Sequence, residues 1–216
     1  MASSKALSTL QRELLQAFFA RTQDFFLTGG AALAEFYLHH RETEDLDLFT
    51  LPGVEISVGV QALIDATHSL GGSAKVLRES GDFKRYVVSR GTEMTLVDLV
   101  VDRAPQTAEK QSFGSVRVDA VSEIAANKLC ALLDRIEVRD LIDLELLLQM
   151  GLSLEAVLED AQKKHAGADP GTLAWVLSQF RIPPTAPIPG GRTREAVEAF
   201  RDGLIATLAK LALPAQ

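Results

Sequence analysis

Residues 25–50 constrain the fold of this chain more than any other stretch, because they combine two kinds of periodicity around a glycine pair. They read FFLTGGAALAEFYLHHRETEDLDLFT. The apolar start predicts a short buried strand over 25–27, the glycines predict a tight turn, and the segment 31–37 predicts a helix. The final DLDL alternates carboxylate and leucine, which is the pattern of a strand with one buried face. The stretch therefore predicts a strand, a turn, a helix and a second strand in immediate succession.

The composition allows one large folded domain or two smaller ones, since 47% of the 216 residues are hydrophobic. A formal charge of −7 argues against a broad basic surface, although a local basic cleft is compatible with it. The single cysteine, Cys130, excludes an intrachain disulfide and a cysteine-rich zinc site, and it favours a reducing compartment, so we expect a cytoplasmic protein. The first residues lack the apolar core of a signal peptide and no apolar run reaches membrane-spanning length, so we expect no membrane partner.

The character of the chain changes near residues 105–120, where short strands give way to apolar residues at helical spacing. We expect an α+β protein with an N-terminal lobe over 1–118, which contains a small mixed sheet, and an α-helical C-terminal lobe over 119–216. A cleft is expected where the lobes meet. The expected helices are 8–19, 58–70, 122–135, 138–150, 153–165, 170–179 and 192–213, and the further strands are 73–79, 83–89 and 94–101.

Asp45 and Asp47 project from the same side of their strand and repel each other unless a cation neutralises them. Mg²⁺, or Mn²⁺ in its place, is the natural partner, because it is commonly held by one or two carboxylates together with phosphate oxygens. A third acid is expected on a neighbouring strand, where it would complete the metal set or act as a general base. Asp98, inside the apolar run MTLVDLVVD, is the candidate and Asp102 is its rival.

The turn formed by Thr28, Gly29 and Gly30 fits the same chemistry. Glycines between a strand and a helix let a phosphate approach the backbone, where N–H groups at the helix start can bind it. Two metal ions close together would activate the attacking oxygen and support the leaving pyrophosphate. Either motif alone is most simply a turn or a solvated acidic pair, but together and in this order they predict in-line nucleotidyl transfer from a nucleoside triphosphate.

The sequence resembles the nucleotidyltransferases of the DNA polymerase β superfamily, in which a glycine pair precedes a metal-binding Dx[DE] pair. The segment LTGGAALAEFYLHHRETEDLDLF resembles the AbiEii-type toxin nucleotidyltransferases more closely still. Ala31 and Thr43 stand where that family frequently has threonine and serine. The helix between the motifs is about one residue longer than usual. A second anchor, EIAANKLCALLDRIEVRDLIDLELLL, resembles the helical motifs of the family.

The resemblance implies a nucleotidyltransferase-like fold for the N-terminal lobe and a nucleoside triphosphate bound with Mg²⁺. It also implies tRNA as the acceptor, a role as a toxin, and a separately encoded antitoxin as partner. It places nucleotide-binding roles on Lys128, Asp140 and Asp143, with Lys128 holding phosphates. A structural ion-pair network of both aspartates with Arg135 and Arg139 is the alternative for these positions.

Three further cations, Arg41, Lys84 and Arg85, could line the path of the nucleotide or the acceptor, but solvated surface charge is the simpler expectation for each. Two other functions stay open. A small-molecule nucleotidyltransferase, such as one that modifies an aminoglycoside, would suit an acidic cleft, whereas tRNA should prefer Lys and Arg around the opening. The second is a binding module of the same fold, which holds a nucleotide or a partner without turnover. Failure to bind Mg²⁺ and nucleotide in calorimetry would favour this module over an enzyme.

Overall fold

The computed structural model describes residues 6–213, which divide into two units. The second unit comprises Ala104–Ala108 and the chain from Val121 onward, and the first comprises the other residues up to Ala120. The sequence predicts a division after residue 118. In the structure the second unit also includes Ala104–Ala108, the short segment that precedes the last two strands of the first unit.

The first unit is built on a seven-stranded mixed sheet, which confirms the expected α+β class. The strand order is β3-β4-β5-β2-β1-β7-β6. β2 is parallel to β5 and β1 is parallel to β7, and the other neighbouring pairs are antiparallel. The hairpin β6–β7 is not among the strands that the sequence predicts. The strands are β1 (Phe25–Thr28), β2 (Asp45–Thr50), β3 (Ser73–Ser80), β4 (Phe83–Arg90), β5 (Glu93–Val101), β6 (Gln111–Phe113) and β7 (Val116–Val118).

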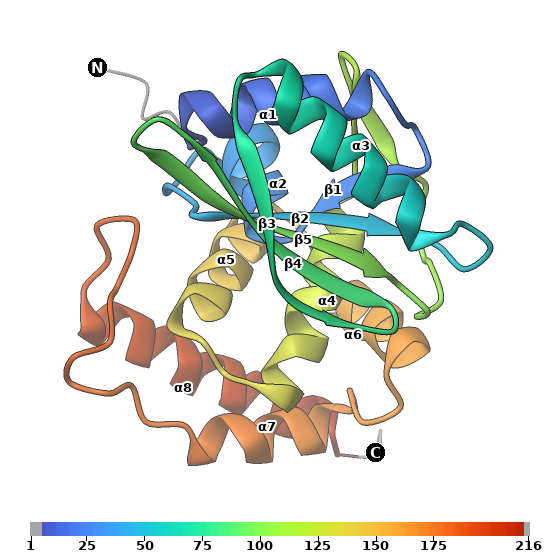
Figure 1. Cartoon of the computed structure of the whole chain (residues 1–216). Coiled ribbons are helices and arrows are strands. Elements are labelled where there is room, and N and C mark those ends of the chain that lie inside the picture. Colours follow the sequence, from blue (N-terminus) through green and yellow to red (C-terminus); the bar gives the residue numbers. More distant parts are fainter. Residues whose placement is uncertain (1–5, 214–216) are drawn as a thin grey trace. The chain divides into compact units, whose positions relative to one another are not determined.

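Two helices of the first unit, α1 (Thr9–Phe19) and α3 (Ile56–Ser69), lie together along one face of the sheet (Figure 1). α1 begins after Ser8, whose hydroxyl caps the helix by accepting a backbone N–H. On α3, Gly59 permits close approach to β1, because a Cβ there would lie 2.4 Å from the ring of Phe25. The face of the sheet that carries Phe25 is therefore covered by α1 and α3.

The register of strand pairing assigns each residue to a face of the sheet. Leu27, Leu48 and Leu99 are cross-strand neighbours on the helix-covered face, and all three are fully buried. Burial of one leucine side chain stabilises the fold by about 1.5–3 kcal/mol relative to its exposure. Because successive residues alternate between faces, Thr28 and Asp47 belong to the opposite face.

The segment after the glycine pair differs from the expected helix. The helix was expected to begin at Ala31, but α2 (Gly29–Ala32) already begins at the glycines and continues as a π-helix, η1 (Leu33–Leu38). A π-helix closes its hydrogen bonds over one more residue than an α-helix. His39 follows it in the left-handed conformation, with a φ of 50°. The glycines are thus part of the helix and not only of the turn before it.

The second unit consists of five helices within the part of the chain that the structure describes, as expected. α4 packs against α5, α6 and α7, and α8 packs against α5 and α7. Ser153, Asp169 and Thr193 cap α6, α7 and α8 by accepting backbone N–H groups. No helix among residues 6–213 combines the length and the apolar character needed to cross a membrane. The helices are α4 (Val121–Asp134), α5 (Val138–Gln149), α6 (Leu154–Lys164), α7 (Pro170–Gln179) and α8 (Arg194–Leu211).

Candidate active site

The glycine turn brings a carboxylate against the start of a helix. Gly29 has a φ of +67°, which lies in the left-handed region that favours glycine. A Cβ at this position would lie 2.2 Å from Oδ2 of Asp47, so the carboxylate occupies the space that any other residue would need. Thr28 is the cross-strand partner of Asp47, which places β1 and β2 in the register that produces this contact. The two sequence motifs therefore meet in one place, and the binding of phosphate by Gly29 stays a prediction.

Two of the predicted carboxylates are direct neighbours across strands. Asp47 on β2 pairs in register with Asp98 on β5, and Asp45 lies two residues before Asp47. Paired residues and residues two apart project from the same face, so all three side chains emerge opposite α1 and α3. Asp102 follows the end of β5, and its N–H donates to the carbonyl oxygen of Thr50 at 2.8 Å, at the far end of β2. Asp98 rather than Asp102 therefore lies beside the pair.

Asp98 is engaged by a cation of the neighbouring strand. Nε and Nη2 of Arg85 donate to its two carboxylate oxygens at 2.7 and 2.6 Å, and Asp98 is only 5% exposed. The hydrogen bond to Asp98 raises the pKa of Arg85 more than burial lowers it, and the negative charges of all three carboxylates act in the same direction. Arg85 is therefore the counter-ion of the carboxylate group, which corrects the expectation of a solvated surface charge.

The carboxylates offer the oxygen donors that Mg²⁺ prefers. Nevertheless, among residues 6–213 no group of three or more His, Cys, Asp or Glu side chains is arranged to hold a metal ion. Both oxygens of Asp98 are bound to Arg85, so Asp98 joins a ligand set only in competition with that guanidinium. Asp45 and Asp47 fit a metal that takes its remaining ligands from phosphate and water. The metal roles of the three aspartates stay predictions.

Two residues between the motifs fix the loop that leads into β2. The hydroxyl of Thr43 donates to Oδ1 of Asp45 at 3.2 Å, so threonine supplies here the hydroxyl that serine would provide. Arg41 is only 7% exposed, and a Cβ on Gly30 would lie 2.5 Å from its Nη2. Arg41 is therefore packed beside the second glycine, which corrects the expectation that it is solvated.

A buried ion pair, which the sequence does not mark, anchors the glycine turn. Asp119 accepts from the hydroxyl of Thr28 at 2.8 Å and from Nζ of Lys110 at 2.7 Å. Nζ of Lys110 lies 4.2 Å from the ring centroid of Phe26, and the Tyr37 hydroxyl donates to the Asp119 carbonyl oxygen at 2.8 Å. Burial and then the charge of Asp119 raise the pKa of Tyr37 to about 12. Because the Thr28 hydroxyl bonds to Asp119, the side chain of Thr28 holds the turn in position. A contact between Thr28 and the nucleotide stays a prediction.

In the helical unit, the structure brings together the three residues that the family resemblance singles out. Nζ of Lys128 lies 2.5 Å from Oδ1 of Asp140 and 2.8 Å from Oδ2 of Asp143, and all three residues are buried. Burial lowers the pKa of Lys128, but the charges of Asp143 and Asp140 and their hydrogen bonds outweigh burial, so the pKa is raised. A lysine of α4 is thus an ion-pair partner of both aspartates. Arg135 and Arg139, the partners expected for a structural network, bond to Glu137.

Glu123 ties the segment Ala104–Ala108 to the helical unit. Its fully buried carboxylate accepts from the backbone N–H groups of Thr107 and Ala108, both at 2.8 Å, and pairs with Lys164. Burial raises the pKa of Glu123, but the hydrogen bonds from Lys164 and Thr107 outweigh burial and hold the pKa below its ordinary value.

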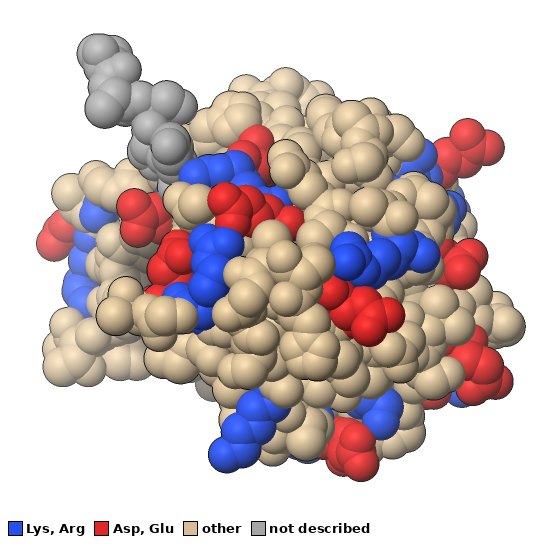
Figure 2. All heavy atoms as spheres, turned by 45° about the horizontal axis from the view of Figure 1, so that its top comes forward, with Lys and Arg blue, Asp and Glu red and all other residues tan. Residues whose placement is uncertain are grey.

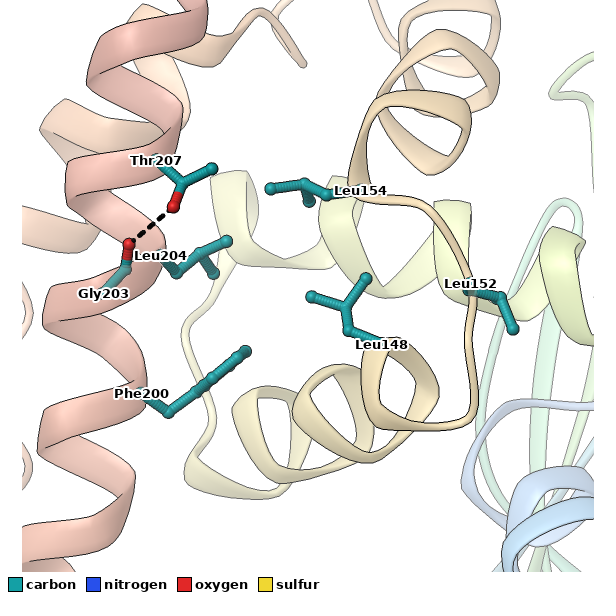
Figure 3. A pocket seen from close by; sticks show the side chains of 7 residues that line it. All are labelled: Leu148, Leu152, Leu154, Phe200, Gly203, Leu204 and Thr207. Atoms are coloured by element: carbon teal, nitrogen blue, oxygen red, sulfur yellow. Dashed lines mark hydrogen bonds between the residues drawn. The ribbon is translucent and has the colours of Figure 1, made fainter.

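A groove in the helical unit contrasts with these polar sites. It is lined mainly by leucines of α5, α8, the first residue of α6 and the connection between α5 and α6 (Figure 3). Its one hydroxyl, on Thr207, donates to the carbonyl oxygen of Gly203 at 3.0 Å. No charged side chain lines it, so it does not fit a triphosphate. The lining residues are Leu148, Leu152, Leu154, Phe200, Gly203, Leu204 and Thr207.

A left-handed glycine turn set against strand-borne carboxylates is the arrangement of a nucleotidyltransferase. The comparison with known families agrees: residues 13–210 match the family described as "Nucleotidyl transferase AbiEii toxin, Type IV TA system". The chain belongs to this family and is a nucleotidyltransferase of the toxin–antitoxin class.

Two solved structures have the same fold. MenT4, a nucleotidyltransferase toxin from Mycobacterium tuberculosis H37Rv, is 20% identical with a TM-score of 0.68, and the alignment covers 95% of this chain and 83% of that chain. JHP933 from Helicobacter pylori is 20% identical with a TM-score of 0.57, and the alignment covers 94% of each chain. At this identity the likeness establishes the fold alone. No individually curated protein matches the chain.

Proposed function

We propose that this protein transfers a nucleotide from a nucleoside triphosphate to an acceptor in a Mg²⁺-dependent reaction, and that the acceptor is tRNA. The observation that carries the proposal is the position of Asp47, whose carboxylate lies against Gly29 and in register with Asp98. A carboxylate held between a glycine turn and a second acid supports a site where phosphate and cation meet.

Each part of the site has a role in this reaction. Asp45 and Asp47 would hold Mg²⁺, or Mn²⁺, which when bound neutralises the charge of the phosphates. Backbone N–H groups at Gly29 and Gly30 would take phosphate oxygens. The acceptor oxygen forms a bond to the α-phosphorus while the bond to pyrophosphate breaks, and pyrophosphate leaves with the electron pair. The hydroxyl proton passes to a base, for which Asp98 is the candidate.

The cluster of Lys128, Asp140 and Asp143 enters the proposal through the family resemblance. Lys128 would hold phosphates, as a compact charge that exchanges partners more readily than a forked guanidinium does. Its two carboxylate partners keep it charged and oriented in the absence of nucleotide. Membership of a type IV toxin–antitoxin family further implies a cognate antitoxin, and we propose that the protein acts as the toxin in the cytoplasm.

The proposal is tested by incubating the protein with each labelled nucleoside triphosphate, total tRNA and Mg²⁺. Wild type should label tRNA, whereas Asp47→Asn should lower the labelling rate on the order of 100-fold or more. Asp65→Asn is the matched control, because Asp65 is an exposed acid of α3. Equal labelling by wild type and Asp47→Asn would sink the assignment. Labelling of an aminoglycoside in place of tRNA would move the acceptor to the small-molecule class.

A further inference from the structure

The edge strand β3 contains a β-bulge at Leu77. Before the bulge, Lys75 pairs with Val87 of β4, and after it Arg78 pairs with Arg85. From one of these pairs to the other, β3 advances by three residues while β4 advances by only two, so one residue of β3 has no partner on β4. Val87 and Arg85 share a face because they are two residues apart. Lys75 and Arg78 therefore project from that same face although they are three residues apart.

This face is the one that carries the catalytic candidates. Each of the two cations heads a row of cross-strand partners through β3, β4, β5 and β2. The row from Arg78 ends at Asp47, and the row from Lys75 ends at Asp45. With neighbouring strands about 4.8 Å apart, three spacings amount to ~14 Å. The bulge therefore brings both positive charges of the edge strand to the carboxylate face.

Lys75 and Arg78 differ from the other cations of their hairpin. Both are exposed, and neither forms an ion pair within residues 6–213. Lys84 on the opposite face, by contrast, pairs with Glu79 at 2.8 Å. In the view of Figure 2, most blue side chains lie next to red ones, while a few stand apart from any red side chain. Two exposed cations without a carboxylate partner are available to bind an anion.

An aromatic ring accompanies the cations. The guanidinium carbons of Arg78 and Arg85 lie 5.9 and 5.8 Å from the ring centroid of Phe83, which is partly exposed. Cationic side chains next to an aromatic ring are a combination that binds single-stranded nucleic acid, because the cations contact phosphates while a base stacks on the ring.

We propose that Lys75, Arg78 and Phe83, which we call the basic strip, bind a single-stranded segment of a nucleic-acid acceptor. The two cations contact its phosphodiester backbone, and a base stacks on the ring. The inference rests on the proposed function and states where on the first unit the acceptor lies. The phosphate oxygens of a triphosphate that share Mg²⁺ with the carboxylates lie about 2.1 Å from the ion. The two cations of the strip lie on a strand ~14 Å away, a span that a polymer covers more readily than a triphosphate. A cationic small molecule would be repelled from this strip by Lys75 and Arg78, whereas a polyanion would be attracted to it.

The test measures RNA binding separately from transfer. Fluorescence anisotropy with an end-labelled tRNA transcript, without nucleotide, gives Kd at a series of salt concentrations. The variant Lys75→Gln/Arg78→Gln should raise Kd about tenfold and reduce the slope of log affinity against log salt by about 1.4, because each contact to a single-stranded phosphate contributes about 0.7. The control Lys163→Gln/Lys210→Gln removes the same charge from exposed positions of α6 and α8 and should bind like wild type.

The outcomes separate the strip from the proposed function. An unchanged Kd and slope in Lys75→Gln/Arg78→Gln would overturn the strip, and so would a loss of nucleoside triphosphate affinity with intact RNA binding. If wild type labels tRNA while this variant binds RNA normally, the strip alone is refuted. If wild type labels no acceptor, the proposed function is refuted. Matching thermal unfolding curves establish that the variants are folded.

Discussion

The contact between Gly29 and Asp47 makes a sharp prediction about a single added methyl group. Gly29→Ala places a Cβ where Oδ2 of Asp47 now lies, at 2.2 Å. Ordinary contact of such a Cβ begins at 3.4 Å, so the two groups must separate by about 1.2 Å, and the backbone must keep a φ of +67° that disfavours alanine. Two penalties therefore act together, one on the backbone and one on the position of the carboxylate.

The magnitude of each penalty can be worked out separately. Holding an L-residue in the left-handed region costs about 1–2 kcal/mol. Forcing an additional methyl group into a packed site costs about 1–3 kcal/mol. Gly29→Ala should therefore lower the free energy of unfolding by about 2–5 kcal/mol. Gly91→Ala is the matched control, because Gly91 has a φ of +57° but nothing within 4 Å of the added Cβ, so it should lose only the backbone share.

Chemical denaturation of the four proteins in a double-mutant cycle isolates the contact. Asp47→Ala removes the carboxylate, so Gly29→Ala should cost less in that background, with a coupling energy of about 1–3 kcal/mol. The same displacement should abolish labelling of tRNA by Gly29→Ala, whereas Gly91→Ala should keep it. If Gly29→Ala and Gly91→Ala cost the same and the coupling is below about 0.5 kcal/mol, the reasoning about this site is wrong.

Three further predictions concern charges that the structure pairs. Arg85→Gln leaves the buried carboxylate of Asp98 without its counter-ion and should cost about 1–3 kcal/mol. Mg²⁺ should raise the melting temperature of this variant more than that of wild type, and equal shifts would contradict the counter-ion role. Lys128→Met leaves two buried carboxylates without their counter-ion and should lower the free energy of unfolding in urea by about 3–5 kcal/mol. A decrease below about 1 kcal/mol would count against the buried cluster. Glu123 has a lowered pKa, so its stabilisation is complete above its ordinary value of 4.5 and is lost as pH falls through the lowered value. The stability difference between wild type and Glu123→Gln should therefore shrink on acidification, and a constant difference would refute this.

Strong local periodicity explains which parts of the site the sequence predicts. The alternation in β2 shows that Asp45 and Asp47 share a face, because the side-chain period of a strand is two residues. Asp98 is recognisable as an acid inside an apolar run. Its place beside Asp47, however, depends on the register of β2 against β5, which is a tertiary property. The sequence singles out Arg85 as a cation but does not reveal its role, since it becomes the partner of Asp98 only through the register of β4 against β5.

The support beneath the glycine turn lies beyond sequence reasoning for a different reason. Strands β6 and β7 have three residues each, which is too short to display an alternating pattern. Without them, Lys110 and Asp119 look like ordinary charged residues on either side of a turn. The only signal is Gly114 between two short segments of mixed polar and apolar residues, and it marks a turn without indicating what the hairpin holds.

The π-helix after the glycine pair is a place where the fold can take up a change in length. The resemblance to the family predicts that the segment between the two motifs is about one residue longer than usual. A π-helix closes each hydrogen bond over one residue more than an α-helix, so η1 can accommodate the addition within the helix itself. Arg41 then packs beside Gly30, and Thr43 bonds to Asp45, immediately before β2. Gly29 and Asp47 meet through the pairing of β1 with β2. We therefore expect their contact to be independent of the length of the helix that joins the two motifs.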